Sequence, residues 1–390
     1  MSVLLAPRGT QSAELTVDLG AIAENTSTFA ARTSAAVMAV VKADGFGHGA
    51  ADVARTALAN GATRLGVTNV DEALALRDEG IDAPILSWLN AVDADFGAAG
   101  LAGVELAVPS REHLDAIAGG LGRGHPRPNL WDEGAPDPTR SPGAYVHLHL
   151  DTGLARDGAE PEAWSDLCRA ARRAELDRTL QVVGVMGHLS HADVPGDSAN
   201  STARTRFAWG LQTARAAGLR PRWRHLAATA ATLTDPLAHH TLCRIGAGLV
   251  GIDPSRTTRL RPAMTLQAPV VTVRRVRAGT PVGYGHTWTA PAATYLGLLP
   301  LGYADGLPLS ASGTAHVALR GRRHPVVGRI SMDQLVVDLG DDPVLPGEVA
   351  TVFGPGDAGE PTVAEWATWA GTIEHEIVTR IGSRVRRRVA

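Results

Sequence analysis

The residue whose position best suits covalent chemistry is a single lysine at the end of an apolar run. Lys42 follows residues 37–41 and precedes three glycines, Gly45, Gly47 and Gly49. A lysine flanked by buried positions loses hydration, which lowers its pKa and makes its neutral amine available for Schiff-base chemistry. On position alone, a lysine that extends from a strand end to solvent is the more common arrangement. A glycine-rich turn is weak support by itself.

Further polar side chains lie at the ends of other strand-like runs. Asp151 and Arg156 follow residues 145–150, His188 ends residues 182–188, and Arg244 lies near the start of residues 242–250. If these runs are parallel strands, their carboxyl ends share one rim, where side chains from distant segments form a site. We therefore expect Lys42 to lie on the same rim as this group.

The elements that position these residues are eight short apolar runs alternating with helix-like segments. The runs are residues 37–41, 64–68, 84–89, 104–108, 145–150, 182–188, 222–226 and 242–250. The segments between them are rich in Ala, Leu and Arg, with acidic residues near their starts, as helix amino termini prefer. This pattern favours a (β/α)8 barrel of the TIM type. A doubly wound sheet would normally show a dinucleotide-binding glycine turn after its first strand, where this chain has a lysine.

Beyond about Leu260 the pattern changes to short strand-like runs separated by Gly, Pro and Asp. The runs are residues 270–276, 295–299, 315–319, 334–338 and 348–353, with helical periodicity in 362–370 and 374–380. The sequence therefore predicts an α/β plus β chain, with a barrel over residues 13–258 and a mostly β domain over 259–390, to which residues 1–12 could contribute. We expect the Pro- and Gly-rich stretch 119–143 to be a surface loop and the basic run 384–388 to be a solvated tail.

The composition excludes several classes of protein. Of the 390 residues, 44% are hydrophobic and 20% are charged, which is typical of soluble globular domains. A net charge of −3 offers no basic field for nucleic acid, and no apolar stretch approaches the length of a membrane span. Cys168 and Cys243 are too few for a disulfide framework, and residues 1–12 lack the apolar core of a signal peptide. We expect a cytoplasmic protein that binds neither nucleic acid nor membrane.

The segment AVVKADGFGHG around Lys42 resembles the pyridoxal-phosphate signature of the alanine racemase family, whose members are fold type III pyridoxal-phosphate enzymes. Further family motifs follow in the same order: LDTGLARDG, VMGHLSHAD, RHLAATAATLTDP, RIGAGLVGID, RPAMTLQAPV, VGYGHTW, PLGYADGLP, VGRISMDQLVVDLG and GTIEHEIVTRI. The ordered set covers nearly the whole chain and is far more specific than any single motif. It implies a pyridoxal 5'-phosphate barrel followed by a β domain, and racemisation of a small amino acid, foremost L-alanine to D-alanine for cell wall biosynthesis.

The resemblance also implies a two-base mechanism. Lys42 would exchange a proton with one face of the substrate Cα and Tyr284, in VGYGHTW, with the other. His188 and Arg244 match the family's residues beside the cofactor, with Arg244 facing the pyridine nitrogen. Because arginine keeps its proton, that nitrogen would stay unprotonated, which weakens the ring as an electron sink and limits side reactions.

The same resemblance assigns the remaining contacts. The backbone near Gly246 and Ala247 and the Thr229 hydroxyl would bind the phosphate, as a glycine turn before a helix suits an anion. The substrate would meet Arg156, Tyr303, Met332 and Asp333. In the family, Tyr284 and the Met332 segment come from the partner subunit, so a head-to-tail homodimer with shared active sites is implied.

Five positions depart from the family pattern. Phe46 and His375 replace tyrosines near the phosphate, and both are kept as cofactor-binding candidates. Ala228 and Thr229 replace an Asn-Ser pair, and His149 replaces a lysine, often carbamylated, that steadies the neighbouring arginine. Each lost hydrogen bond to a charged group costs about 1.5–3 kcal/mol, so weaker cofactor binding or an altered substrate pocket is expected.

Several other functions remain open from the sequence. A metal enzyme could use His147, His149, His188 and His191, but acidic companions at ligand spacing are missing, so no metal site is predicted. A non-enzymatic pyridoxal-phosphate carrier shares the barrel but lacks the β domain. A decarboxylase of the same fold draws β-domain strands from both chain ends, whereas here the β pattern lies almost wholly after Leu260. A racemase of another amino acid, such as serine, is also possible.

Overall fold

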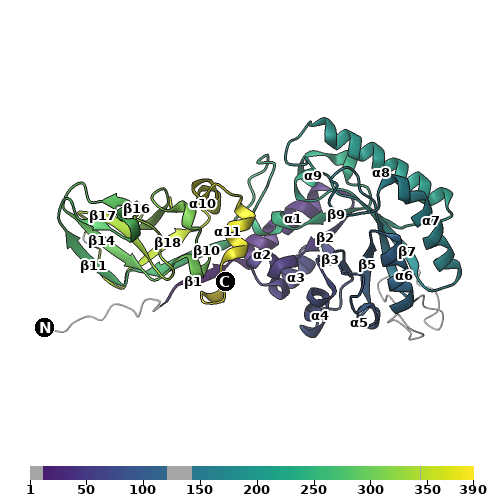
Figure 1. Ribbon diagram of the computed structural model, residues 1–390, viewed down its shortest axis with the longest axis horizontal. Coiled ribbons are helices and arrows are strands. Elements are labelled where there is room, and N and C mark those ends of the chain that lie inside the picture. Colours follow the sequence, from purple (N-terminus) through teal and green to yellow (C-terminus); the bar gives the residue numbers. More distant parts are fainter. Residues whose placement is uncertain (1–11, 121–142, 343) are drawn as a thin grey trace. The chain divides into compact units, whose positions relative to one another are not determined.

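A computed structural model describes residues 12–120, 143–342 and 344–390 (Figure 1). Contacts divide the chain into two compact units, one of residues 22–260 and one that joins residues up to Ala21 to residues 261–390. The two units are described separately below.

The unit of residues 22–260 contains an eight-stranded parallel sheet in the order β8-β7-β6-β5-β4-β3-β2-β9. Its strands are β2 (Ala36–Val40), β3 (Ala62–Val67), β4 (Ile85–Ser87), β5 (Val104–Val108), β6 (Tyr145–His149), β7 (Gln181–Met186), β8 (Trp223–His225) and β9 (Leu242–Ile245). Backbone hydrogen bonds from Thr241 N to Arg224 O and from Arg244 N to Ala227 O, both 3.1 Å, link the segments of the two outer strands. The eight predicted runs therefore form a nearly closed barrel, which confirms the predicted fold class.

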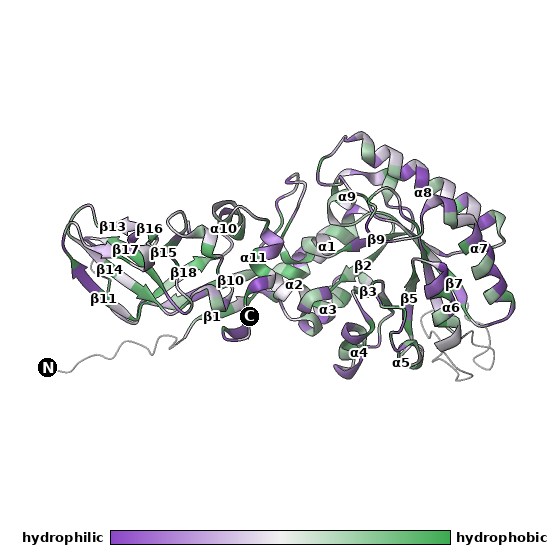
Figure 2. Ribbon diagram, viewed as in Figure 1, coloured by the Kyte–Doolittle hydropathy of each residue, from purple (hydrophilic) through white to green (hydrophobic). Residues whose placement is uncertain are grey.

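Helices surround these strands. They are α1 (Leu19–Arg32), α2 (Lys42–Gly47), α3 (Ala50–Ala59), α4 (Val70–Asp78), α5 (Phe96–Leu101), α6 (Arg111–Gly120), α7 (Pro161–Leu176), α8 (Ser198–Ala216) and α9 (Thr229–Thr234), with short 3-10 turns η2 (Pro236–Ala238) and η3 (Ala247–Val250). Figure 2 shows apolar strands inside and helices such as α7 and α8 with mixed polar and apolar surfaces. The buried Trp164 of α7 donates to Gly210 O of α8 at 2.9 Å, so these two helices pack closely on the barrel.

The second unit is built on a nine-stranded sheet in the order β11-β14-β17-β16-β15-β18-β10-β1-β19, with a separate hairpin of β12 and β13. The strands are β1 (Glu14–Val17), β10 (Met264–Pro269), β11 (Thr272–Val276), β12 (Pro281–Val282), β13 (Trp288–Thr289), β14 (Thr294–Leu299), β15 (His316–Leu319), β16 (Arg322–Val327), β17 (Leu335–Gly340), β18 (Val349–Phe353) and β19 (Arg386–Val389). The 3-10 turns are η4 (Tyr284–His286), η5 (Tyr303–Asp305) and η6 (Leu309–Ala311). The predicted mostly β character of this part is confirmed.

Two helices complete this unit, α10 (Val363–Ala370) and α11 (Glu374–Arg380), where helical periodicity was expected. Thr362 caps α10: its hydroxyl accepts from Glu365 N at 3.2 Å, and the Glu365 carboxylate accepts from Thr362 N at 2.9 Å. This reciprocal capping fixes where α10 begins.

The two chain ends differ from the sequence-based expectation. Strand β1 pairs antiparallel with β10 and parallel with β19, so residues 14–17 belong to the β sheet and not to a barrel that starts at residue 13. The basic run expected as a solvated tail contributes instead to β19, the outermost strand of the sheet order. An edge strand tolerates charged residues because its outer side faces solvent. Since the β unit does draw strands from both chain ends, that argument against a decarboxylase does not hold.

Two expectations fall largely on residues outside the described ranges. The loop expected over 119–143 is one of them, since only its first residues, at the end of α6, and residue 143 are described. The contribution expected from residues 1–12 is the other, because the described chain begins at residue 12.

Candidate active site

Lys42 begins α2, directly after the carboxyl end of β2. The four residues that follow have positive φ angles: Ala43 51°, Asp44 54°, Gly45 61° and Phe46 57°. They form a left-handed turn, which costs roughly 1–2 kcal/mol for each residue other than glycine. Strain of this kind persists only where neighbouring contacts impose it, and such sites are often functional.

Glu72, on the first turn of α4, provides one of these contacts. Its Oε1 accepts from Ala43 N at 2.8 Å and its Oε2 accepts from Thr68 N at 2.7 Å. The carboxylate thereby joins the segment after β2 to the segment after β3. Sequence analysis did not single out this residue. An acidic residue three positions after Asn69, the helix cap, is the signal that could have drawn attention to it.

Lys42 is partly buried, and its surroundings favour the neutral amine. Burial lowers the pKa of Lys42 and the nearby charge of Arg156 lowers it further, while Glu72 acts in the opposite direction. A lysine with a lowered pKa can act as a nucleophile and as a proton acceptor near neutral pH.

Arg244 lies in β9 with its guanidinium buried beside His188 and His225. Its Nη1 donates to His225 Nδ1 at 2.9 Å and to His225 O at 2.8 Å. Its Nη2 donates to Gly187 O at 2.8 Å, to His188 Nδ1 at 3.1 Å and to Leu226 O at 3.2 Å. Burial lowers the pKa of Arg244 to about 10, so the guanidinium stays charged at neutral pH. Among the described residues, all of its hydrogen bonds use Nη1 and Nη2, which leaves the Nε–H as the donor for a further acceptor.

His188 follows β7 and carries no charge at neutral pH. Burial lowers the pKa of His188 to about 3, with Arg244 and Arg156 as the largest charges that add to the effect. Since Nδ1 accepts from Arg244, the proton of the neutral ring lies on Nε2. The structure thus brings Lys42, His188, Arg244 and the charge of Arg156 to the carboxyl-end side of the barrel, as the strand ends predicted.

A second group of predicted residues lies around the turn after β9. The Thr229 hydroxyl oxygen accepts from Gly246 N at 3.3 Å and from Gly248 N at 3.2 Å. The Phe46 ring packs so close to Gly246 that a Cβ there would meet Phe46 Cζ at 2.7 Å. The turn at Gly246 and Ala247 therefore packs closely against Thr229 and Phe46. Phe46 contributes a ring without a hydroxyl to this cluster.

Arg156 lies on an exposed turn after β6. Asp151 holds this turn, because its Oδ1 accepts from Gly153 N at 2.8 Å and from Leu154 N at 3.0 Å. His149 lies 3.4 Å from the Asp157 carboxylate, measured from its Nδ1. His149 thus contacts the residue that follows Arg156 in the sequence.

Tyr284 belongs to the other unit, where it lies on the turn between β12 and β13 with 73% of its surface exposed. Gly283 and Gly285 on either side have φ angles of 70° and 71°, which an L-residue adopts only with strain. This tight turn leaves the Tyr284 side chain largely exposed on the β unit.

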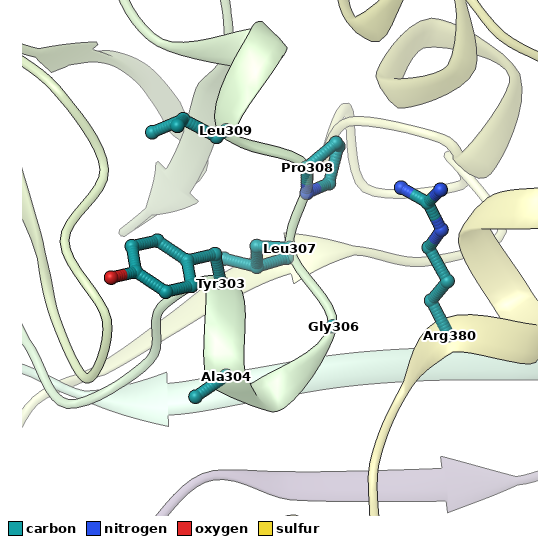
Figure 3. Close-up of a pocket in the computed structure, with 7 residues that line it drawn as sticks. All are labelled: Tyr303, Ala304, Gly306, Leu307, Pro308, Leu309 and Arg380. Atoms are coloured by element: carbon teal, nitrogen blue, oxygen red, sulfur yellow. The ribbon is translucent and has the colours of Figure 1, made fainter.

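Tyr303, Met332 and Asp333 lie together in this second unit. Tyr303 N donates to Ser331 O and Ala304 N donates to Met332 O, both at 3.0 Å. The Asp333 carboxylate pairs with Arg384 at 2.7 Å. Tyr303 also lines a cavity of about 390 Å³, and Figure 3 shows it across the segment Gly306–Pro308 from Arg380 of α11.

His375, the remaining candidate, is a partly buried residue in the first turn of α11. It shares this helix with Arg380, which lines the cavity beside Tyr303. The structure therefore places Tyr284, Tyr303, Met332, Asp333 and His375 in the second unit, and the other candidates in the barrel.

The histidines considered for a metal site have other partners. His147 contacts Glu105 at 2.9 Å and His225 at 2.8 Å inside the barrel, and His191 contacts Ser190. The described residues contain no group of three or more His, Cys, Asp or Glu side chains that could hold a metal ion. Within the same residues, no helix is both long and apolar enough to cross a membrane.

Two charged residues in the barrel interior, Arg64 of β3 and Glu105 of β5, form a buried ion pair that was not predicted from the sequence. The available signal was a charged residue within each of two otherwise apolar strand-like runs. Such charges are almost never fully buried unless they are paired.

Comparisons with known proteins agree with this arrangement. The family models for the alanine racemase N-terminal domain and C-terminal domain match residues 17–254 and 263–389. An alanine racemase of Salinispora arenicola is 47% identical over 373 residues, which cover 95% of this chain and 96% of the relative. The solved alanine racemase of Streptomyces coelicolor A3(2) has a TM-score of 0.91 at 43% identity and covers 98% of both chains.

Two further solved structures carry ligands. The alanine racemase of Bacillus anthracis, with bound L-Ala-P, has a TM-score of 0.83 at 30% identity and covers 99% of this chain and 96% of its own. The alanine racemase of Bartonella henselae, with covalently bound pyridoxal phosphate, has a TM-score of 0.84 and covers 97% of this chain and 99% of its own. At 23% identity, the latter likeness shows the fold alone.

Proposed function

Because this chain belongs to the alanine racemase family, we propose that it interconverts L- and D-alanine with pyridoxal 5'-phosphate, using Lys42 and Tyr284 as the two proton-transferring groups. The observation that carries this proposal is the partly buried Lys42 amine, whose pKa burial lowers, at the carboxyl end of a barrel strand. A racemase needs such a group on one face of the substrate Cα and a second on the opposite face.

The residues on the barrel fit this cofactor. Since the Thr229 oxygen already accepts from two amides, its hydroxyl proton remains available to a phosphate oxygen. The Arg244 Nε–H is the donor left for the pyridine nitrogen, and the Lys42 amine, whose pKa burial lowers, suits the aldehyde. When bound, the cofactor supplies an electron sink that acidifies the substrate Cα–H.

We assign the substrate carboxylate to the Arg156 guanidinium and to the backbone of the segment formed by Met332 and Asp333 of the partner subunit, with the partner subunit's Tyr303 beside the path by which substrate enters. The exposed guanidinium of Arg156 lies close enough to Lys42 to lower the lysine pKa, so a carboxylate bound to Arg156 lies near the reacting centre. The analogue bound to the Bacillus anthracis protein supports a substrate of this class.

The proton transfers divide between the two groups. Lys42, whose pKa burial lowers, takes the α-proton of one enantiomer, and its protonated form returns a proton when the reaction runs the other way. The partner subunit's Tyr284 does the same on the opposite face. His188 stays neutral between Arg244 and the reacting centre and holds its proton on Nε2, where it can donate to the phenol oxygen.

The shared site implies a head-to-tail homodimer. Tyr284 and Met332 are 73% and 52% exposed on the β unit, so both are accessible to a second copy of the chain. The protein is proposed to act in the cytoplasm, where the buried free thiols Cys168 and Cys243 would stay reduced.

The proposal is tested by incubating the chain with L-alanine in D₂O while α-proton exchange is followed by NMR and optical activity by circular dichroism. We expect both the α-proton and the optical activity to disappear. Tyr284→Phe should retain the visible absorbance of the lysine-bound cofactor and exchange the α-proton of one enantiomer, with racemisation slower by about 10²-fold or more. Lys42→Ala should lose that absorbance.

A panel that includes L-serine decides whether another amino acid is the preferred substrate. A wild-type chain that exchanges no α-proton in the panel and shows no cofactor absorbance would contradict the proposal. Normal racemisation by Tyr284→Phe would contradict the two-base assignment alone.

A further inference from the structure

A continuous chain of polar side chains crosses the interior of the barrel beneath the proposed site. Arg64 pairs with Glu105, Glu105 contacts His147 Nε2 at 2.9 Å, and His147 Nδ1 lies 2.8 Å from His225 Nε2. His225 Nδ1 then accepts from Arg244 at 2.9 Å. Glu105 is 2% exposed, and both histidines are completely buried.

The two ends of this chain fix the direction of every hydrogen bond. Burial alone would raise the pKa of Glu105, but Arg64 and His147 hold it at about 2, so the carboxylate can only accept. Burial lowers the pKa of His147 and keeps the ring neutral, so the proton that His147 donates to Glu105 lies on Nε2. His147 Nδ1 is then an acceptor.

The same reasoning extends to the next ring. Burial, followed by the charge of Arg244, lowers the pKa of His225 far below its ordinary value, so this ring is neutral too. It donates from Nε2 to His147 and leaves Nδ1 as the acceptor for Arg244. Each hydrogen bond between Arg244 and Glu105 is therefore donated in the direction of the Glu105 carboxylate.

Filling a barrel core with charged and polar side chains carries a large desolvation cost. Burying an ion pair is often no better for stability than well-packed apolar residues of similar volume. Arg64 has an additional contact that suits a fixed cation, because its Cζ lies 4.5 Å from the Trp223 ring centre. A role beyond stability is therefore indicated, and the far end of the chain, Arg244, shows what that role can be.

We propose that Arg64 and Glu105 are a positioning pair, which acts through His147 and His225 to hold the Arg244 guanidinium in the orientation that presents its Nε–H to the cofactor. The inference rests on the proposed function. With the opposite tautomer, His225 would turn an N–H towards the Nη1 of Arg244. Two donors would then face each other, and the guanidinium would have to turn away.

The test uses the double variant Arg64→Met/Glu105→Leu. Because both charges are removed together, no unpaired charge of this ion pair remains buried. Histidine-selective ¹⁵N NMR of the full-length chain, with and without pyridoxal 5'-phosphate, reports which ring nitrogen carries the proton. We expect Nε2–H tautomers for His147 and His225 in the wild type and loss of the single tautomer at His225 in the double variant. Cofactor binding should weaken by at least about fivefold.

Two further variants separate positioning from a general loss of stability. Glu105→Gln keeps the shape but offers an amide that can accept or donate, so it should also release the tautomer. Arg77→Met is the matched control: this arginine donates to Ala102 O and Ala83 O on the barrel periphery, and its loss should leave the histidine signals and cofactor affinity unchanged.

The inference is overturned if the folded double variant keeps both tautomers and binds the cofactor like the wild type, or if wild-type His225 carries its proton on Nδ1. A wild-type chain that binds no cofactor would instead contradict the proposed function, since the histidine signals are measured independently of binding.

Discussion

At the scale of single residues, the Thr229 hydroxyl has the clearest part in the phosphate site that we propose. It accepts from the amides of Gly246 and Gly248 and so shapes the turn after β9. Its proton remains available for a phosphate, so one hydroxyl both orders the turn and contributes a donor. The replacement of the family's serine by threonine preserves this function.

Thr229→Ala should therefore weaken cofactor binding by roughly tenfold or more, because it removes a hydrogen bond to a charged group and the acceptor of two amides. Thr229→Ser keeps the hydroxyl and should bind the cofactor like the wild type. Titration of each variant with pyridoxal 5'-phosphate, followed by absorbance, measures the difference. Equal affinity of the alanine and serine variants would show that Thr229 does not contact the phosphate.

The sequence predicted which residues gather at the barrel rim because each of them follows a recognisable strand. Lys42, His188 and Arg156 were located in this way. The sequence did not reveal that Arg64 and Glu105 meet, because their contact depends on which side chains of β3 and β5, two strands separated by β4, lie inside the barrel. The strain after Lys42 was equally hidden, since only Gly45 in that turn is a residue that favours positive φ.

At the scale of elements, strands β3, β5, β6, β8 and β9 each supply one member of the polar chain in the barrel core. Three neutral histidines, His147, His188 and His225, have pKa values below their ordinary value of about 6.5. The unfolded chain binds protons at these histidines near pH 6.5, whereas the folded barrel does not. Stability must therefore fall as the pH is lowered below that value.

We expect the free energy of unfolding to fall between pH 6.5 and 5, by up to about 1.4 kcal/mol per pH unit for each histidine. The Glu105 carboxylate, with a folded pKa of about 2, adds a further loss only below about pH 4.5. Urea unfolding at a series of pH values measures both effects. A stability that is constant from pH 7 to 5 would contradict the assignment of neutral histidines.

The apolar runs predicted the eight barrel strands because parallel strands buried on both faces are continuous in hydrophobicity. The ends of the chain carried no such signal. Strand β1 has four residues and β19 is mostly arginine, and both exist through pairing with segments far away in sequence. A strand that depends on a distant partner cannot be recognised from its own residues.

At the scale of the whole molecule, the predicted site residues are divided between two units of one chain. Lys42 and Arg244 belong to the barrel, and Tyr284 and Met332 belong to the β unit, where both are exposed. We propose a homodimer in which each site takes Lys42 from one subunit and Tyr284 from the other. The sequence suggested this arrangement only through family resemblance, because a single chain does not encode its symmetry in any local pattern.

Mixing two inactive variants tests this central claim most directly. Lys42→Ala and Tyr284→Phe chains are unfolded together in equal amounts, refolded, and assayed for alanine racemisation. Random pairing makes half of the dimers mixed, and each mixed dimer has one site with both groups intact, so about one quarter of wild-type activity should return. A chain carrying both substitutions, mixed with Lys42→Ala, should restore none. No recovery in the first mixture, with dimers formed and cofactor bound, would contradict a site shared between Lys42 and the partner subunit's Tyr284.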